Sequence, residues 1–354
     1  MADEVRLRDG SVPRVDLQGI GEANAPLRPA DASAAYAALD LGTNNCRLLI
    51  ARPSEEGFRV IDSFSRIIRL GEGVSTTGRI SDAAISRAVS ALGVCSDKIR
   101  AKGAKRLRTI ATEACRAAEN SQDFLDLIES TTGIRLEIID RETESTLAVI
   151  GCSPLLDHQS KGAILFDIGG GSTEVVRIER PKGDPHAPPT KGPWISLPLG
   201  VVTLAERYGG HDVTRESYSA MIDEVATHLA TFAAEHGGDL ADMHLLGTSG
   251  TVTTVAGIHL GLLRYDRRRV DGIWMDAHEM DRAIAKLLAM NYDERAANAC
   301  IGTERADLVL AGCAILDAIR RAFPLSRLRI ADRGLREGML VEMMRADGVL
   351  ATSS

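Results

Sequence analysis

The chain has 354 residues and a formal net charge of −7, with 44% hydrophobic and 26% charged residues. This length is sufficient for two domains that each have a hydrophobic core. The acidic balance argues against a protein that coats nucleic acid, which usually needs a basic face. No run approaches the length of a transmembrane helix, and the first residues lack the basic start and apolar stretch of a secretory signal. We therefore expect a cytoplasmic protein with no nucleic-acid or membrane partner.

Regular structure is predicted to begin near Tyr36. Residues 1–34 have few large apolar side chains and no periodicity, so we interpret them as a mobile tail. Alternating and helical patterns then predict strands at 36–41, 46–50, 106–111 and 134–139, and helices from Ser81, at 112–119, around 124–128 and at 142–150.

The second half of the chain is predicted to start in the same way. It has strands at 163–167, 174–178, 194–197, 243–246 and 328–331, and helices at 214–236, 277–289 and 303–322. A proline-rich stretch at 181–193 precedes a resumed strand pattern, so we interpret it as a hairpin loop and not as a domain linker.

An apolar strand ending in Asp, a glycine turn and a returning strand occur twice, at Asp40 and at Asp167. Their separation is far longer than a solenoid repeat, which favours two related lobes. We predict a first lobe at 35–157 and a second at 158–354, with a ligand site in the cleft between them.

Both glycine turns expose successive backbone N–H groups to an approaching phosphate, because glycine has no Cβ to block it. The candidate phosphate-binding residues of these turns are Gly42, Thr43, Asn44, Asn45, Gly169, Gly170, Gly171, Ser172 and Thr173. Asp40 and Asp167, at the strand ends, are candidates to hold Mg²⁺ or its waters. Each turn alone is also compatible with an ordinary tight β-turn, and the repetition favours phosphate contact.

A third turn rich in glycine and hydroxyl groups precedes a helix that starts near Val252. Its residues are Gly247, Thr248, Ser249, Gly250 and Thr251. The N–H groups at a helix N-terminus attract anions, although Thr248 or Ser249 could equally be an ordinary helix cap.

Six stretches together resemble the exopolyphosphatase/guanosine pentaphosphate phosphatase (Ppx/GppA) family of the actin-like ATPase superfamily. They are residues 40–44, 167–174, 69–73, 111–120 and 247–251, and the pair 305–307 with 332–338. The resemblance runs from about Tyr36 to Met344. It implies an α/β fold of two ribonuclease-H-like, actin-like lobes with an active-site cleft between them.

The resemblance implies roles for four residues. Glu144 matches the catalytic glutamate, which orients or deprotonates the attacking water, and Glu174 matches an acidic position near the metal ion and that water. Asp167 matches a Mg²⁺-binding position, and Arg116 an arginine that contacts the phosphate chain. From the residues alone, both glutamates could be solvated carboxylates, and Arg116 could pair with Glu113 one turn earlier.

Three positions depart from the family pattern. Members usually have Ser at Asn45, Gly at Arg141 and Arg at Thr146. The last two changes lie beside Glu144 and alter how a neighbouring phosphate is held, and Arg141 is a candidate replacement cation.

The function implied is an exopolyphosphatase that uses Mg²⁺ to remove terminal phosphate from inorganic polyphosphate. A guanosine pentaphosphate (pppGpp) 5′-phosphohydrolase needs the same loops plus room for a nucleoside, and both activities can coexist. A nucleotide-dependent actin-like assembly protein is the non-enzyme alternative, and residues 111–120 and 332–338 argue against it. A sugar kinase is a further enzyme alternative. A homodimer is compatible with the family, but no residue pattern indicates one.

Overall fold

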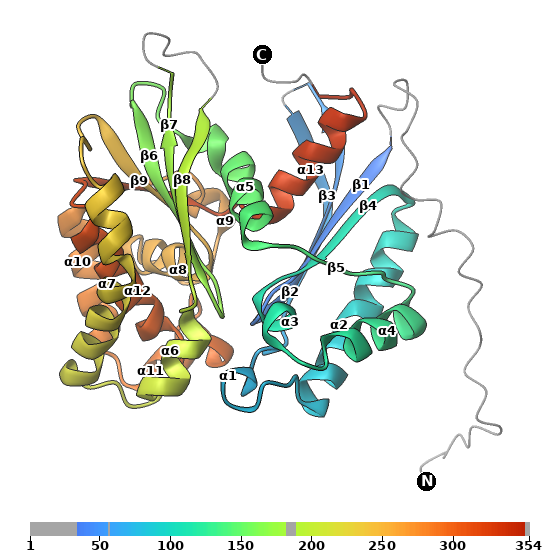
Figure 1. Ribbon diagram of the computed structural model, residues 1–354, viewed down its shortest axis with the longest axis horizontal. Coiled ribbons are helices and arrows are strands. Elements are labelled where there is room, and N and C mark those ends of the chain that lie inside the picture. Colours follow the sequence, from blue (N-terminus) through green and yellow to red (C-terminus); the bar gives the residue numbers. More distant parts are fainter. Residues whose placement is uncertain (1–33, 56, 182–188, 351–354) are drawn as a thin grey trace.

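The computed structural model describes residues 34–55, 57–181 and 189–350. Two β-sheets with flanking helices lie side by side (Figure 1). The predicted N-terminal tail falls outside the described residues except for Ala34, as does the tip of the proline-rich loop. Within the described part of the chain, no helix combines the length and hydrophobicity that crossing a bilayer requires.

The first sheet has the strand order β3-β2-β1-β4-β5. Its strands are β1 (Ala35–Leu41), β2 (Asn45–Ser54), β3 (Gly57–Ile67), β4 (Ala104–Ala111) and β5 (Glu137–Ile138). Strand β1 pairs antiparallel with β2 and parallel with β4. The predicted strand at 134–139 is wrong in extent, because only two of its residues pair with β4. Strand β3 was not predicted, because it is an edge strand whose residues are half-buried or exposed and form no clear apolar face.

The second sheet repeats this arrangement and adds one strand, in the order β10-β11-β9-β6-β7-β8. Its strands are β6 (Gly162–Ile168), β7 (Thr173–Glu179), β8 (Thr190–Leu197), β9 (Met243–Thr248), β10 (Trp274–Asp276) and β11 (Arg327–Ala331). Strand β6 takes the place of β1, with β7 antiparallel and β9 parallel beside it. The internal repeat therefore corresponds to two lobes of the same topology, which confirms the predicted two-lobed α/β fold.

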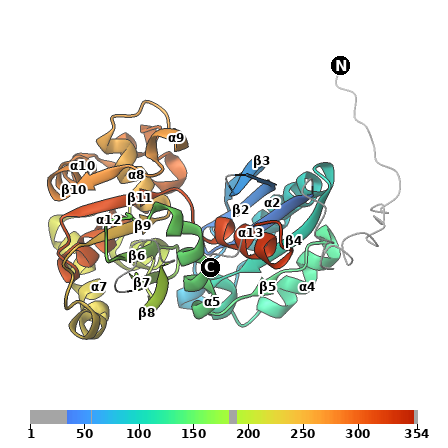
Figure 2. The ribbon, with the colours of Figure 1, turned by 90° about the horizontal axis from the view of Figure 1, so that it is seen from above.

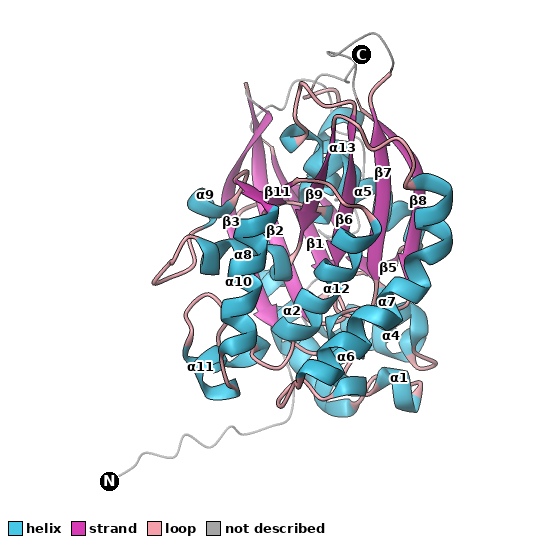
Figure 3. Cartoon of the chain, turned by 90° about the vertical axis from the view of Figure 1, so that its left-hand side faces the viewer, coloured by secondary structure: helices cyan, strands magenta, loops and turns pink. Residues whose placement is uncertain are grey.

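Helices flank both sheets. In the first half they are α1 (Val74–Thr77), α2 (Asp82–Ala101), α3 (Glu113–Ala117), α4 (Ser121–Thr132) and α5 (Arg141–Cys152). The short 3₁₀ helix η1 (Ser153–Leu155) ends the first half. The second half contains α6 (Val201–Tyr208), α7 (Arg215–His236), α8 (Gly250–His259), α9 (Arg267–Val270), α10 (Ala277–Ala289), α11 (Tyr292–Ala297), η2 (Thr303–Arg305), α12 (Val309–Ala322) and α13 (Leu335–Ala346). Figure 3 shows α7, α8, α10 and α12 in front of the second sheet. Ser81 caps α2 as predicted, with its hydroxyl accepting from the Ala84 N–H, whereas the helix predicted at 303–322 is divided into η2 and α12.

Helices α5 and α13 pack against each other between the two sheets (Figure 2). Helix α13 also contacts β1, while α5 contacts β7 and β8. One buried apolar cluster joins residues of both sheets to this helix pair, including Tyr36, Leu165 and Leu340. The lobe boundary near 157 remains a proposal, and the last helix of the chain packs against the first sheet.

The α5–α13 contact depends on glycine. A Cβ on Gly338 would overlap the carbonyl oxygen of Leu147, so Gly338→Ala must push the two helices apart. We expect a loss of about 1–3 kcal/mol in the free energy of unfolding, measured by urea denaturation. The control is Gly93→Ala in α2, where a Cβ meets no atom within 4 Å. It should be neutral or stabilise by about 0.5–1 kcal/mol; equal losses for both variants would contradict this account.

Candidate active site

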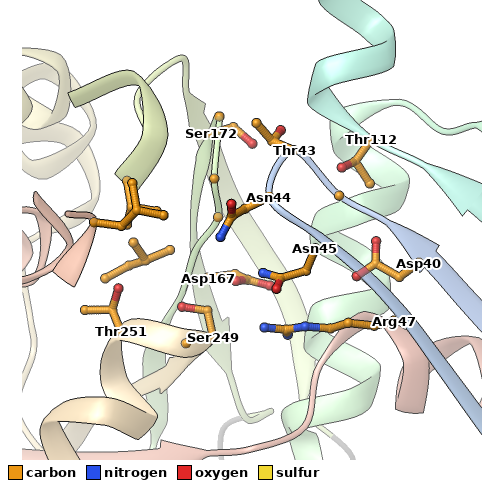
Figure 4. A pocket seen from close by; sticks show the side chains of 18 of the residues that line it. Asp40, Thr43, Asn44, Asn45, Arg47, Thr112, Asp167, Ser172, Ser249 and Thr251 are labelled. Atoms are coloured by element: carbon orange, nitrogen blue, oxygen red, sulfur yellow. The ribbon is translucent and has the colours of Figure 1, made fainter. Parts of the chain in front are cut away.

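A cavity of about 130 Å³ lies where the first strands of the two sheets end (Figure 4). The glycine turns that follow strands β1 and β6 line this cavity from opposite lobes. The ends of their parallel neighbours β4 and β9 lie beside them, which brings Thr112 and Ser249 to the same cavity. The predicted interlobe cleft is therefore present in the fold.

The structure brings most of the predicted site residues together around this cavity. Those that line it are Asp40, Gly42, Thr43, Asn44, Asn45, Glu144, Asp167, Gly169, Gly170, Gly171, Ser172, Glu174, Ser249, Gly250 and Thr251.

Four predicted residues do not line it. The Thr173 hydroxyl donates to the Leu199 carbonyl, and Thr248 donates to the Arg333 carbonyl at 2.6 Å. Gly247 is buried, and a Cβ there would meet Phe166. These three residues therefore make contacts within the protein next to the turns and do not face the cavity. Arg116 acts through Glu144, as described below.

The two glycine turns present amide groups without acceptors. Carbonyl groups of the turns accept hydrogen bonds from N–H groups outside the turns. Thr43 accepts from Gly71, Asn44 from Ile68, and Gly170 from Val202. Among the described residues, no acceptor takes the N–H groups of Thr43, Asn44, Gly170, Gly171 and Ser172. Unpaired N–H groups beside a cavity form an anion-binding concavity.

The two turns also touch each other. A Cβ on Gly170 would lie 2.9 Å from the Cβ of Thr43, and one on Gly171 would lie 2.8 Å from the Thr43 hydroxyl oxygen. Glycine is therefore required at both positions for the lobes to approach this closely. As a result, amide groups of both lobes face one small volume.

Two buried polar atoms at the cavity have no protein partner. They are Asn44 Oδ1 and Ser249 Oγ, both among the unpaired buried atoms of the described chain. Ser249 also has a φ of 95°, in the region that favours glycine. Such strain in a non-glycine residue clusters at functional sites. Both observations fit a site completed by a polar ligand.

Glu144 is held by Arg116 at the edge of the cavity. Arg116 Nη2 donates to Glu144 Oε2 at 2.7 Å and to Glu113 Oε2 at 2.9 Å. Arg116 Nη1 donates to the Ile139 carbonyl at 2.8 Å. Glu144 is buried, and Asp140 caps its helix by accepting from the Thr143 N–H. Arg116 thus pairs with Glu113 and also fixes a buried carboxylate, while its contact with the phosphate chain stays a prediction.

Four acidic side chains at the cavity have raised pKa values. Burial raises the pKa of Asp167 to about 7, with further contributions from the charges of Glu174 and Asp40. Burial is also the main cause that raises the pKa values of Asp40, Glu144 and Glu174. The nearby arginines do not fully neutralise the charge of these carboxylates, so the site favours a bound cation.

The donor set fits a hard divalent cation. Among the described residues, no three His, Cys, Asp or Glu side chains converge closely enough to enclose a metal ion. Mg²⁺ does not need such a cage, because it keeps several waters and uses one or two carboxylates together with substrate phosphates. Asp40 and Asp167, on strands from the two lobes, provide such carboxylates.

The residues beside Glu144 that depart from the family pattern have partners in this chain. Arg141 Nη2 donates to Glu113 Oε1 at 2.8 Å. Lys191 of β8 donates to the Thr146 hydroxyl at 2.9 Å, so a lysine from the second lobe provides a cation next to Thr146. Arg141 does not line the cavity.

Arg141→Ala should therefore act through Glu113 and Arg116. We expect a rise of a few-fold in KM, in line with an exposed pair worth about 0.2–1 kcal/mol, with kcat largely retained. Steady-state kinetics on Arg141→Ala and Arg141→Lys checks this, because Lys keeps the charge. An unchanged KM in the alanine variant would show that Arg141 has no part in substrate binding.

Two stretches without an assigned role meet across the cleft. Arg69, which follows β3, forms an ion pair with Asp307 at 2.9 Å and donates to the Glu304 carbonyl at 3.2 Å. The Gly73 N–H donates to Glu206 of α6 at 2.9 Å. These contacts join the lobes on either side of the loops.

Sequence reasoning missed Arg47 and Thr112 as cavity residues and gave Arg305 no role. Arg47 follows Asn45 by two positions on β2, so the alternation of a strand places both side chains on one face. That signal was available. The position of Arg305 depends on a turn between α11 and α12, which no local pattern indicates.

Comparisons with known proteins agree with this geometry. A model of the Ppx/GppA phosphatase family matches residues 49–347. A guanosine-5'-triphosphate,3'-diphosphate pyrophosphatase of Photobacterium profundum is 29% identical over 322 residues, covering 87% of this chain and 59% of that protein. This chain thus spans 59% of the length of that curated relative.

Solved structures agree in fold. The crystal structure of an Aquifex aeolicus member of the Ppx/GppA family is 27% identical, with a TM-score of 0.72 and coverage of 88% of this chain and 98% of that one. An exopolyphosphatase from Cytophaga hutchinsonii is similar in fold, with 22% identity, a TM-score of 0.79 and coverage of 89% and 99%.

Proposed function

Because the chain belongs to the Ppx/GppA phosphatase family, we propose that it is a Mg²⁺-dependent exopolyphosphatase that hydrolyses the terminal phosphate of inorganic polyphosphate. One observation carries the proposal. Free amide groups of two glycine turns face one small cavity, at whose edge Arg116 holds the buried Glu144. A terminal phosphate and an attacking water both have a place in this arrangement.

The turns would bind the terminal phosphate. The amides of Thr43, Asn44, Gly170, Gly171 and Ser172 would donate to its oxygens, with hydroxyl groups adding further donors. Such preorganised donors stabilise charge that develops in the transition state. The positive charge of Arg116 would act in the same direction while it keeps Glu144 in place.

Glu144 would orient the attacking water and accept its proton. The water oxygen forms a bond to the terminal phosphorus, and the bridging P–O bond breaks. The products are orthophosphate and a chain one unit shorter. Burial raises the pKa of Glu144, which makes the carboxylate a better proton acceptor once it is ionised.

Asp167 and Asp40 are the residues that would hold Mg²⁺, with Glu174 near the metal and the water. When bound, the ion neutralises charge on the phosphoryl group being transferred. Ser196 donates to Glu174 at 2.8 Å and so fixes that carboxylate in the cavity wall.

Hydrolysis of guanosine pentaphosphate is the second candidate. The relative from Photobacterium profundum, named for this type of substrate, supports it, as does a larger chamber next to the cavity. We expect the protein to act in the cytoplasm, and a homodimer is compatible with the family.

Orthophosphate release separates the two candidates. Long-chain polyphosphate and guanosine pentaphosphate would be compared with Mg²⁺ and with EDTA. We expect Mg²⁺-dependent release from polyphosphate. Release from the nucleotide alone would favour the second candidate, and no release from either would overturn the proposal.

Mg²⁺ should stabilise the protein more at pH 8 than at pH 5.5. The folded state raises the pKa of Asp167 from 3.8 to about 7, so it binds protons more tightly than the unfolded chain. Proton binding to Asp167 therefore adds to the free energy of unfolding. This stabilisation is fully present below the unfolded pKa and is lost as pH rises through about 7. A bound cation offsets the loss. Thermal unfolding with and without Mg²⁺ tests this, and an equal Mg²⁺ shift at both pH values would contradict it.

A further inference from the structure

Helix α5, which carries Glu144, has contacts with both lobes. From the first lobe, Arg116 donates to the Glu144 carboxylate at 2.7 Å. From the second lobe, strand β8 lies beside α5 and contacts it (Figure 1). Both contacts therefore bear on where Glu144 lies.

The contact with β8 centres on one lysine. Lys191 Nζ donates to the Thr146 hydroxyl at 2.9 Å and to the Glu142 carbonyl at 3.1 Å. The Thr146 hydroxyl donates in turn to the same carbonyl at 2.8 Å, so the three groups form a closed set of hydrogen bonds. Residues 142 and 146 are one helical turn apart and share one face of α5, with Glu144 between them along the helix. Lys191 thus holds the turn that carries Glu144.

The ammonium group of Lys191 has little freedom to move. It lies 4.8 Å from the centroid of the Trp194 ring, which is a cation–π distance. Trp194 comes from the same strand and packs against the apolar cluster that joins both sheets. Burial lowers the pKa of Lys191, and the charges of Glu142 and Asp140 act against this. In the part of the chain that the structure describes, Lys191 forms no ion pair, so its hydrogen bonds go to α5 and not to a surface carboxylate.

Strand β8 also contacts the second acidic group of the site. Ser196, near the other end of the strand, donates to Glu174 at 2.8 Å. One strand therefore contacts both Glu174 and the helix that carries Glu144. Because β8 is extended and paired with β7, the spacing between its two contacts is fixed. Loss of the Lys191 contact would free α5 to shift relative to Glu174.

We propose that Lys191 is a positioning residue, which fixes the Glu144 turn of α5 to the second lobe so that Glu144 faces the cavity. Arg116 fixes the carboxylate, and Lys191 fixes the backbone of the same turn. Lys191 lines neither of the two cavities at the cleft, so it acts through Glu144 and not on the substrate. The inference rests on the proposed function and deepens it, because the place of the general base then depends on a residue outside the site.

Steady-state kinetics on variants of Lys191 tests this role. Lys191→Met removes both hydrogen bonds but keeps most of the length of the side chain, and Lys191→Arg keeps a cation that can donate. We expect Lys191→Met to lower kcat for phosphate release by about ten- to a hundredfold, because a small misplacement of a reacting group can cost this much. KM should stay close to the wild-type value, since Lys191 does not touch the substrate. Lys191→Arg should retain most of kcat.

A second background separates positioning from a general structural role. In the Glu144→Gln protein, Lys191→Met should lower the residual kcat no further, because the group that Lys191 positions no longer accepts a proton. An equal loss in both backgrounds would overturn the inference. Thr146→Val removes one acceptor from the α5 side of the contact and should lower kcat less than Lys191→Met does. Lys286→Met, at an exposed position on α10, is the control for charge and should leave kcat unchanged.

Hydrogen–deuterium exchange tests the contact without turnover. Peptides that cover residues 141–150 should exchange faster in Lys191→Met than in the wild type and in Lys191→Arg, because the turn opens more often. Unchanged exchange of α5, or faster exchange together with wild-type kcat, would overturn the inference. If the wild type releases no phosphate from either substrate, the proposed function fails, while faster exchange in Lys191→Met would still support the anchoring of α5 by Lys191.

Discussion

Glu144→Gln is expected to lower kcat for phosphate release by about 10²- to 10⁴-fold, the usual contribution of a general base. The amide has the size of the carboxylate but cannot take a proton from water. It can still accept the hydrogen bond that Arg116 donates at 2.7 Å. Substrate binding should therefore change much less than kcat, which steady-state kinetics would show.

Glu142→Gln is the matched control, because Glu142 lies on the same helix but is exposed. It should retain wild-type kinetics. If Glu144→Gln also retained wild-type kcat, another group would have to position the water and the proposed mechanism would be wrong.

Asp167→Asn should have opposite effects on activity and stability. Loss of a carboxylate that holds Mg²⁺ is expected to reduce activity by about 10²-fold or more, since metal stabilisation of a transition state contributes several kcal/mol. The ionised Asp167 lies near Glu174 and Asp40, which raise its pKa together with burial. Removing that charge should stabilise the metal-free protein at pH 8 by on the order of 1 kcal/mol.

The sign of the stability change depends on pH. At pH 5.5 the wild-type Asp167 is largely protonated, because its pKa is about 7; the gain from Asn should therefore be small. Urea unfolding at both pH values measures it, with Asp223→Asn on the exposed surface of α7 as control. A variant that is inactive and also less stable at pH 8 would contradict the account, because misfolding would explain both losses.

Local features of the fold and site were predictable from the sequence. The strands that end at Asp40 and Asp167 are apolar, and each is followed by its own glycine turn, so both loops could be located from short segments. The match between the two segments also predicted two lobes. By contrast, β3 and α13 were not predicted, because their polar and apolar residues show no strong periodicity.

Features that depend on distant segments meeting in the folded protein could not be derived from local sequence patterns. Glu144 was identified through resemblance alone, since its first-turn position on α5 is typical of a solvated carboxylate. Its burial becomes visible only when α5 packs between the lobes. The same holds for Arg47, Arg305 and Arg336, which come from three distant segments and meet only in the folded protein.

The central claim is that water attacks the terminal phosphorus in the cavity between the glycine turns. Hydrolysis of polyphosphate in H₂¹⁸O with Mg²⁺, followed by mass spectrometry of the products, tests it most directly. The account predicts one ¹⁸O atom in each orthophosphate released and none added to the shortened chain. Label in the shortened chain, or no orthophosphate released, would contradict it.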